Sequence, residues 1–98
     1  MTVADDEAYA GPAVVQIESV RYPATIVLAG HFEPLDGRYH WGGRILPVGE
    51  VAEAVRRGVH AATLHIGDRP FAVHLAEVDP WCGVRVRAVG PPPWAAAT

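Results

Sequence analysis

The chain has no lysine and no asparagine, and serine and cysteine each occur only once in its 98 residues. All eight basic residues are arginines, and together with eleven acidic residues they leave a formal net charge of -3. Surfaces that bind nucleic acids or anionic membranes need clustered positive charge, which this composition does not supply. We therefore expect neither a nucleic acid nor a membrane as a partner.

Scarce residue types and missing motifs exclude several kinds of chemistry. The single cysteine, Cys82, excludes an internal disulfide and a site built from several thiolates. The single serine, Ser19, lies in a predicted turn, which excludes a serine hydrolase. No phosphate-binding glycine loop or dinucleotide fingerprint is present, so we expect no cofactor. The acidic N-terminal segment and the lack of an apolar run near the roughly 18 residues of a membrane span lead us to expect a cytoplasmic protein.

What the chain does have is enough apolar material for one domain over residues 1–98, since half of its residues are hydrophobic. Six short stretches rich in β-branched and aromatic residues are separated by glycine, proline or aspartate, as in all-β folds. The strands are expected at residues 13–18, 24–33, 38–46, 59–66, 71–78 and 84–89. We predict a mainly β fold of about six antiparallel strands in a small barrel or half-barrel. Residues 1–8 and 95–98 are expected to be flexible arms.

Residues 48–57 differ from the rest because their apolar positions recur at helical spacing. These positions are Val48, Val51, Ala52 and Val55. Gly58 stands where a glycine would end a helix. We expect a short helix here, lying over one end of the sheet.

The segment from Glu33 to Arg38 has the composition of a hairpin turn, with a proline suited to its first corner and a glycine suited to a positive φ. An even-length loop places Glu33 opposite Arg38 and His31 opposite His40. The apolar face of this hairpin then carries Ile26, Leu28, Phe32, Tyr39, Trp41 and Ile45. The polar face carries Val27, His31, Glu33, Arg38, His40 and Arg44.

A second hairpin is predicted to turn through residues 67–70. The same argument puts Leu64, Phe71 and Val73 on one face. His65 and His74 then lie on the opposite, wetter face.

The polar face of the first hairpin is the most informative feature for function. Two imidazoles and a carboxylate on one face could supply a general acid and a general base near neutral pH, and an arginine could bind an anionic group. The candidate catalytic residues are His31, Glu33 and His40. The candidate substrate-binding residues are Arg38, Arg44, Tyr39, Trp41 and Trp81.

This face has two other interpretations. A solvated sheet face with a Glu33–Arg38 cross-strand pair is common, but the small and apolar residues Ala29 and Gly42 on the same face favour a pocket lining. Two histidines and a carboxylate could also bind a metal ion. We expect no metal, because the guanidinium of Arg38 would compete with a cation for the carboxylate.

The segment Asp79-Pro80-Trp81-Cys82-Gly83 is predicted to be a tight link between the last two strands. In the favoured interpretation Asp79 caps backbone N–H groups and Trp81 packs on the core. A catalytic aspartate is the alternative. Cys82 has no histidine near it in the sequence, which disfavours a nucleophilic role.

Several segments resemble an actinobacterial family known as domain of unknown function 4873. They are Tyr9 to Ala13, the long central segment His31 to Arg44, Asp79 to Trp81, and Gly90 to Trp94. The resemblance implies a small domain that also occurs at the C-terminal end of flavin-dependent monooxygenase-like proteins, often in specialised metabolism. After Asp-Pro-Trp the family pattern continues with glycine, a basic and an aromatic residue, whereas this chain has Cys82, Gly83 and Val84.

Two functions are consistent with these observations. The first is a small cofactor-free acid/base enzyme, of isomerase, cyclase, dehydratase or hydrolase type, acting on a reactive small metabolite. The second is a non-catalytic ligand-binding or docking module that partners a flavin monooxygenase. Six strands leave no large internal cavity, so we expect the site at a barrel mouth, under the helix or at a subunit interface. The surplus of aromatic residues for so small a core leads us to expect a homodimer.

Overall fold

The computed structural model of the chain describes residues 8–90. Within this range the elements follow in the order β1 (Ala8–Ile17), β2 (Val20–Glu33), β3 (Arg38–Ile45), α1 (Gly49–Arg56), β4 (Ala61–Ile66), β5 (Arg69–Val78) and β6 (Val84–Val89). The predicted mainly β fold with one short helix is confirmed. Of the two expected arms, residues 1–7 and 95–98 lie outside the described range, and Ala8 is the first residue of β1. None of the helical segments found between residues 8 and 90 is long and apolar enough to cross a membrane.

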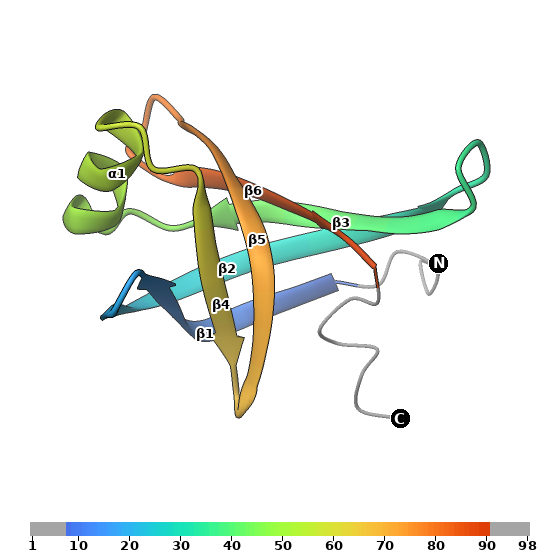
Figure 1. Cartoon of the computed structure of the whole chain (residues 1–98), viewed down its shortest axis with the longest axis horizontal. Helices are drawn as coiled ribbons and strands as arrows, with labels where there is room; N and C mark the ends of the chain where they lie inside the picture. Colours follow the sequence, from blue (N-terminus) through green and yellow to red (C-terminus); the bar gives the residue numbers. More distant parts are fainter. Residues whose placement is uncertain (1–7, 91–98) are drawn as a thin grey trace.

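The six strands close into a barrel in the order β1-β2-β3-β6-β5-β4, and all neighbouring pairs are antiparallel. The ladder between β1 and β4 is short, and it pairs Val14 with His65 and Gln16 with Thr63. Figure 1 shows the long β2–β3 hairpin projecting to one side, while β4 and β5 cross it steeply and end in a hairpin of their own. Strand β6 lies between the two hairpins in the pairing order, so it joins the edge of β3 to the edge of β5.

The predicted register of the β2–β3 hairpin is confirmed. Glu33 pairs with Arg38 and His31 pairs with His40. Ile26, Leu28, Trp41 and Ile45 are buried on the inner face, as their alternation predicts. His31 and His40 therefore share the outer face of the barrel wall.

Strand β1 is longer than predicted, because it begins at Ala8 rather than at residue 13. The early part pairs only with β2, from Ala8 opposite Ala29 to Ala13 opposite Ala24. Its other edge pairs with β4 only from Val14 onward. A proline can stand on such a one-sided edge because no partner needs its missing N–H, which explains Pro12 within the strand.

The second hairpin has a tighter turn than predicted. Ile66 pairs with Arg69, so only Gly67 and Asp68 lie between the strands. Gly67 has a φ of 63°, a conformation that glycine adopts readily. The predicted faces are nevertheless right, because Leu64 pairs with Phe71 on the inner side and His74 pairs with Ala61 on the outer side.

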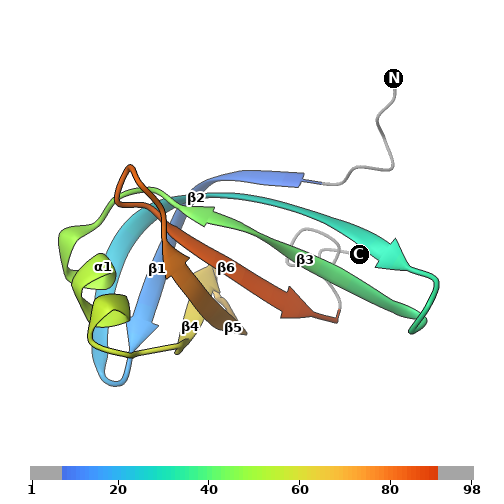
Figure 2. The same ribbon diagram turned by 90° about the horizontal axis from the view of Figure 1, so that it is seen from above.

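Helix α1 covers one end of the barrel and packs against β5 and β6 (Figure 2). It buries Val51, Ala52, Ala54 and Val55, close to the apolar stripe that the sequence predicts. Gly58 follows it with a φ of 104°, as expected of a glycine that ends a helix. The helix closes this end of the core.

Apolar side chains fill the interior of the barrel. The largest fully buried ones are Ile26, Leu28, Ile45, Leu64, Leu75 and Val84. At this strand number a barrel is only wide enough for its own side chains. A ligand site must therefore be sought on the outer surface.

Candidate functional site

A surface groove of about 570 Å³ crosses the outer face of the barrel wall. One row of cross-strand partners runs along it, contributed by β2, β3, β6, β5 and β4 in turn. The row consists of Ala29, Gly42, Arg87, His74 and Ala61. Three of these five positions carry a methyl group or no side chain, so the surface is low there and neighbouring side chains stand above it.

Four of the five histidines line this groove, which we call the histidine groove. They are His31, His40, His60 and His74. His31 and His40 come from the β2–β3 hairpin, whereas His74 lies on β5 and His60 immediately precedes β4. Imidazole side chains from both hairpins therefore meet at one site.

The groove deepens where β5 separates from β6. The paired register of these strands ends at His74 opposite Arg87, although both strands continue. A β-bulge between Leu75 and Glu77, directly after His74 in the chain, bends β5 next to this point. The separation lets the groove reach the inward-facing Trp41 and Val73.

The ring of Trp41 forms part of this deeper wall. It meets Phe71 edge to face, with ring centroids 6.0 Å apart. Trp41 also lies opposite Gly30, where a side chain would clash with Trp41 and Tyr39. The indole is therefore held between two strands, and its position does not depend on a ligand.

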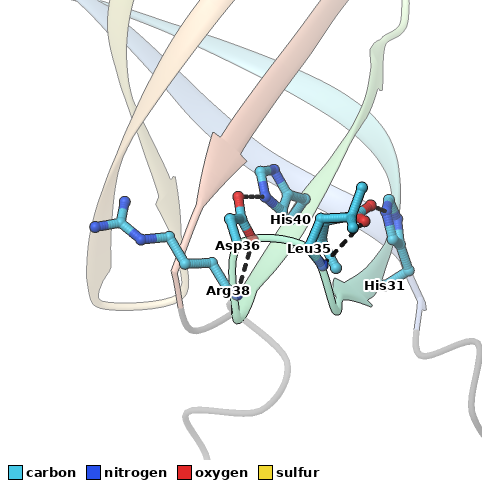
Figure 3. A network of polar contacts seen from close by, with 6 residues as sticks. His31, Leu35, Asp36, Arg38 and His40 are labelled. Atoms are coloured by element: carbon cyan, nitrogen blue, oxygen red, sulfur yellow. Dashed lines mark hydrogen bonds and ion pairs between the residues drawn. The ribbon is translucent and has the colours of Figure 1, made fainter.

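His31 and His40 stack on one wall of the groove, with ring centroids 6.0 Å apart and planes 19° apart. Each ring contacts its own carboxylate. His40 Nε2 lies 2.8 Å from Asp36 Oδ2, and His31 Nε2 lies 3.5 Å from Glu33 Oε1. The result is two histidine–carboxylate pairs side by side (Figure 3).

The hairpin turn holds Asp36 in place. Its second oxygen, Oδ1, accepts a hydrogen bond of 2.9 Å from the backbone N–H of Arg38. Gly37, with a φ of 70°, makes the turn and donates its N–H to the Glu33 carbonyl at 2.9 Å. The hydrogen bond from His40 holds the pKa of Asp36 below its usual range, so the carboxyl is ionised at neutral pH.

This geometry determines which nitrogen of His40 carries the proton. An ionised carboxylate can only accept hydrogen bonds, so Nε2 must be the donor to Asp36. The neutral ring then has its lone pair on Nδ1, where it can take a proton. A carboxylate that orients an imidazole in this way is a common arrangement for a general base.

His60 and His74 form a second stacked pair, with ring centroids 5.8 Å apart and planes 13° apart. His60 Nδ1 lies 3.1 Å from the carbonyl oxygen of Leu75, to which it donates. The backbone carbonyl of His60 in turn accepts the N–H of Leu75 at 2.8 Å. The first contact holds the ring through Nδ1 and leaves Nε2 without a partner among the described residues, and the second holds the backbone of His60.

Arg44 and Trp81 do not join the histidine groove, although the sequence suggested both as substrate-binding residues. The guanidinium of Arg44 binds Asp79 instead, from Nε to Oδ2 and, at 3.2 Å, from Nη2 to Oδ1. Trp81 follows in the same loop, and 73% of its surface is exposed. The interpretation that Trp81 packs on the core is therefore wrong.

The capping role predicted for Asp79 is confirmed. Its Oδ1 accepts the backbone N–H groups of Trp81 and Gly83, each at 2.9 Å. Arg44 and these donors lower the pKa of Asp79 to about 2, and Asp79 in turn raises the pKa of Arg44. Cys82, in the same loop, is exposed and has a φ of 69°. Asp79 thus holds the loop together.

The remaining predicted site residues divide between the two faces of the hairpin. Arg38 lies opposite Glu33 as predicted, but its guanidinium points away from His31 and His40 (Figure 3). The Glu33 carboxylate contacts His31, so the predicted Glu33–Arg38 side-chain pair is replaced by a Glu33–His31 pair. Tyr39 is partly buried against the core. Only His31, His40 and Trp41 of the predicted set line the groove.

Sequence reasoning missed four residues of the site. Three of them line the groove, namely His60, His74 and Arg87, and the fourth, Asp36, contacts His40. Asp36 was treated only as part of a turn. His74 was placed on the outer face of its hairpin, but pairing of β5 with β6 was needed to bring it near His40. The periodicity of β6 could have placed Arg87 on the outer face. Between residues 8 and 90 no three histidine, cysteine, aspartate or glutamate side chains are arranged to hold a metal ion.

The fold and site together define a small closed β-barrel with a histidine-lined groove on its wall. A family model described as Domain of unknown function (DUF4873) matches residues 6–96, so the chain belongs to that family. Similar chains include the uncharacterized protein Rv0943c of Mycobacterium tuberculosis strain H37Rv and the uncharacterized protein Mb0968c of Mycobacterium bovis. Each is 37% identical over 91 residues, which cover 93% of this chain and 26% of the relative. The chain therefore spans about a quarter of the length of these relatives, and no solved structure matches it significantly.

Proposed function

We propose that the protein is a small acid/base enzyme that needs no cofactor and acts on a small metabolite bound in the histidine groove. The observation that carries this proposal is the 2.8 Å contact between His40 Nε2 and Asp36 Oδ2 on the wall of the groove. Asp36 orients the ring and fixes its tautomer, and His40 removes a proton from the substrate through Nδ1. The stacked His31, with Glu33 beside it, is the group placed to return a proton.

Reactions of this type include isomerisation, cyclisation, dehydration and hydrolysis. The resemblance to domains of monooxygenase-like proteins makes products of specialised metabolism, oxygenase products among them, the natural substrates to test. The base itself can be tested without knowing the substrate, because one model reaction reports proton removal from carbon.

The test reaction is the ring opening of nitrobenzisoxazole. A base removes the proton from the ring carbon, the electron pair forms a nitrile, the nitrogen–oxygen bond breaks and a coloured phenolate is released. We expect the protein to open the ring faster than an equal concentration of free imidazole does. His40→Gln should lower kcat/KM by about 100-fold or more, as is typical when a positioned base is lost.

A matched control is available on β4. His65 contacts Gln16 at 2.8 Å and does not line the groove. His65→Gln should therefore leave the rate within about twofold of wild type. Equal rates for wild type, His40→Gln and free imidazole would refute a catalytic base at this site.

One observation favours a second candidate, a non-catalytic module that binds a ligand or docks on a larger protein. The aligned region is only 26% of each mycobacterial relative, so in those proteins the domain accompanies a longer chain. A flavin monooxygenase is the partner that the family resemblance suggests. This candidate would be favoured if ligands bound tightly in the groove and His40→Gln did not change the rate of nitrobenzisoxazole ring opening.

We also propose that the protein forms a homodimer. Phe32, Leu35 and Trp81 are more than half exposed, and Leu35 reaches 94% at the tip of the β2–β3 hairpin. Trp94, which also contributed to this expectation, lies outside the described residues. Exposed apolar side chains of this size often mark contact surfaces. Light scattering should give the mass of a dimer at high micromolar concentration, and a monomer mass would count against it.

A further inference from the structure

Arg87 occupies the middle of the histidine groove. On one side it pairs with Gly42 of β3, and on the other with His74 of β5. The Gly42 position carries no side chain, so nothing from β3 stands beside the guanidinium at this level. Within residues 8–90 the side chain of Arg87 makes neither a hydrogen bond nor an ion pair.

The lining of the groove has no acidic residue to neutralise this charge. The nearest carboxylates in the hairpin, Glu33 and Asp36, contact His31 and His40 and do not line the groove. Glu77 of β5 pairs with Arg85, which lies two residues before Arg87 on the same face of β6. The exposed guanidinium is therefore a permanent positive charge in a groove whose other titratable side chains are imidazoles.

The rest of the lining is apolar. Trp41, Val73 and Ala88 form the inward-facing part of the lining, and the exposed residues Ala72 and Val89 continue it at the surface. Val89 is 50% exposed, and the ladder between β5 and β6 does not reach it. A molecule that filled this groove would cover the apolar part and meet Arg87 at its centre.

From this arrangement we infer that the groove selects a small organic carboxylate with an apolar, flat body. The carboxylate forms a two-point contact with the guanidinium of Arg87, which matches its planar geometry. The apolar body lies against Trp41 and Val73. This inference rests on the proposed function and names its substrate class, since a bound carboxylate would lie between the two histidine pairs.

Naphthalene carboxylate and the corresponding carboxamide are suitable probes, because they share the ring system and differ in charge. We expect the carboxylate to bind wild type at least about tenfold more tightly than the amide, as charged hydrogen bonds contribute more than neutral ones. Titration followed by nuclear magnetic resonance should show the Trp41 indole N–H signal moving on binding. In Arg87→Gln the preference for the carboxylate should fall to less than about threefold.

Arg85→Gln is the matched control, because Arg85 is exposed on the same face of the same strand and does not line the groove. It should keep the wild-type preference. Equal affinity of the two probes for wild type, no binding of either at millimolar concentration, or a preference retained in Arg87→Gln would each overturn the inference. These are equilibrium measurements without a chemical step, so their outcome is independent of the rates measured for His40→Gln.

Discussion

Arg44 on β3 holds Asp79, in the loop between β5 and β6, through two side-chain contacts. The same carboxylate accepts two backbone N–H groups of its own loop, from Trp81 and Gly83. A Cβ at Gly83 would lie 2.6 Å from the Arg44 guanidinium, so a side chain there would displace Arg44 from Asp79. One carboxylate thus joins a barrel strand to the loop that leads into β6.

The first prediction concerns acid stability. The pKa of Asp79 is about 2 in the folded protein against an ordinary value of 3.8, so its ionised form stabilises the fold above about pH 4. This contribution is lost as the pH falls toward 2, because the unfolded chain, in which the Asp79 carboxyl has its ordinary pKa, takes up the proton before the folded protein does. Urea unfolding of wild type and Asp79→Asn should show a difference in free energy that is constant above pH 5 and shrinks below pH 4. A difference independent of pH down to 2 would contradict this.

The second prediction concerns Gly42, which lets β3 and β6 approach under the groove. A Cβ at this position would lie 2.9 Å from the Cα and 3.3 Å from the Cβ of Arg87. Gly42→Ala should lower the free energy of unfolding by about 1–3 kcal/mol, because the strands must shift. Gly49→Ala is the control, since nothing lies within 4 Å of a Cβ there and alanine favours a helix. Urea titration should find the control at least as stable as wild type; equal stability of the two variants would be inconsistent with the close approach.

A third prediction separates two tryptophans that the sequence does not distinguish. Trp41 is 4% exposed and Trp81 is 73% exposed. Trp41→Ala should cost about 3–5 kcal/mol of stability, as is usual for a large aromatic removed from a core. Trp81→Ala should change it by no more than about 0.5 kcal/mol. Thermal or urea unfolding of the two variants measures this directly, and comparable losses would show that Trp81 is packed in solution.

The parts of the fold that could be predicted depend on local pattern. Alternating apolar residues and an even-length turn were sufficient to place His31 opposite His40, because side chains on paired strands repeat every two residues. The apolar spacing of residues 48–57 was sufficient for α1. The start of β1 was missed because Gly11 and Pro12 interrupt its pattern, and only pairing with β2 compensates for them.

The site required information that no single segment holds. Pairing of β6 with both β3 and β5 places Arg87 between Gly42 and His74, and this strand order depends on the long-range pairing of β6 rather than on either hairpin. The partner of Glu33 was mispredicted because strand register places the backbone but leaves side-chain rotamers open, and Glu33 turns to His31 on its own strand. Arg44 was predicted to bind substrate, and the sequence does not show that Asp79 approaches its guanidinium from a distant loop.

The most direct test of the central claim is a double-mutant cycle on His40 and Asp36, with the ring opening of nitrobenzisoxazole as the readout. Asp36→Asn keeps an oxygen that can cap the Arg38 N–H and replaces the other with an N–H₂ donor, which would force His40 into the opposite tautomer. If Asp36 acts through His40, this substitution should lower kcat/KM by about tenfold or more in wild type and leave it unchanged in His40→Gln. Equal losses in both backgrounds would contradict the account, because Asp36 would then act independently of the proposed base.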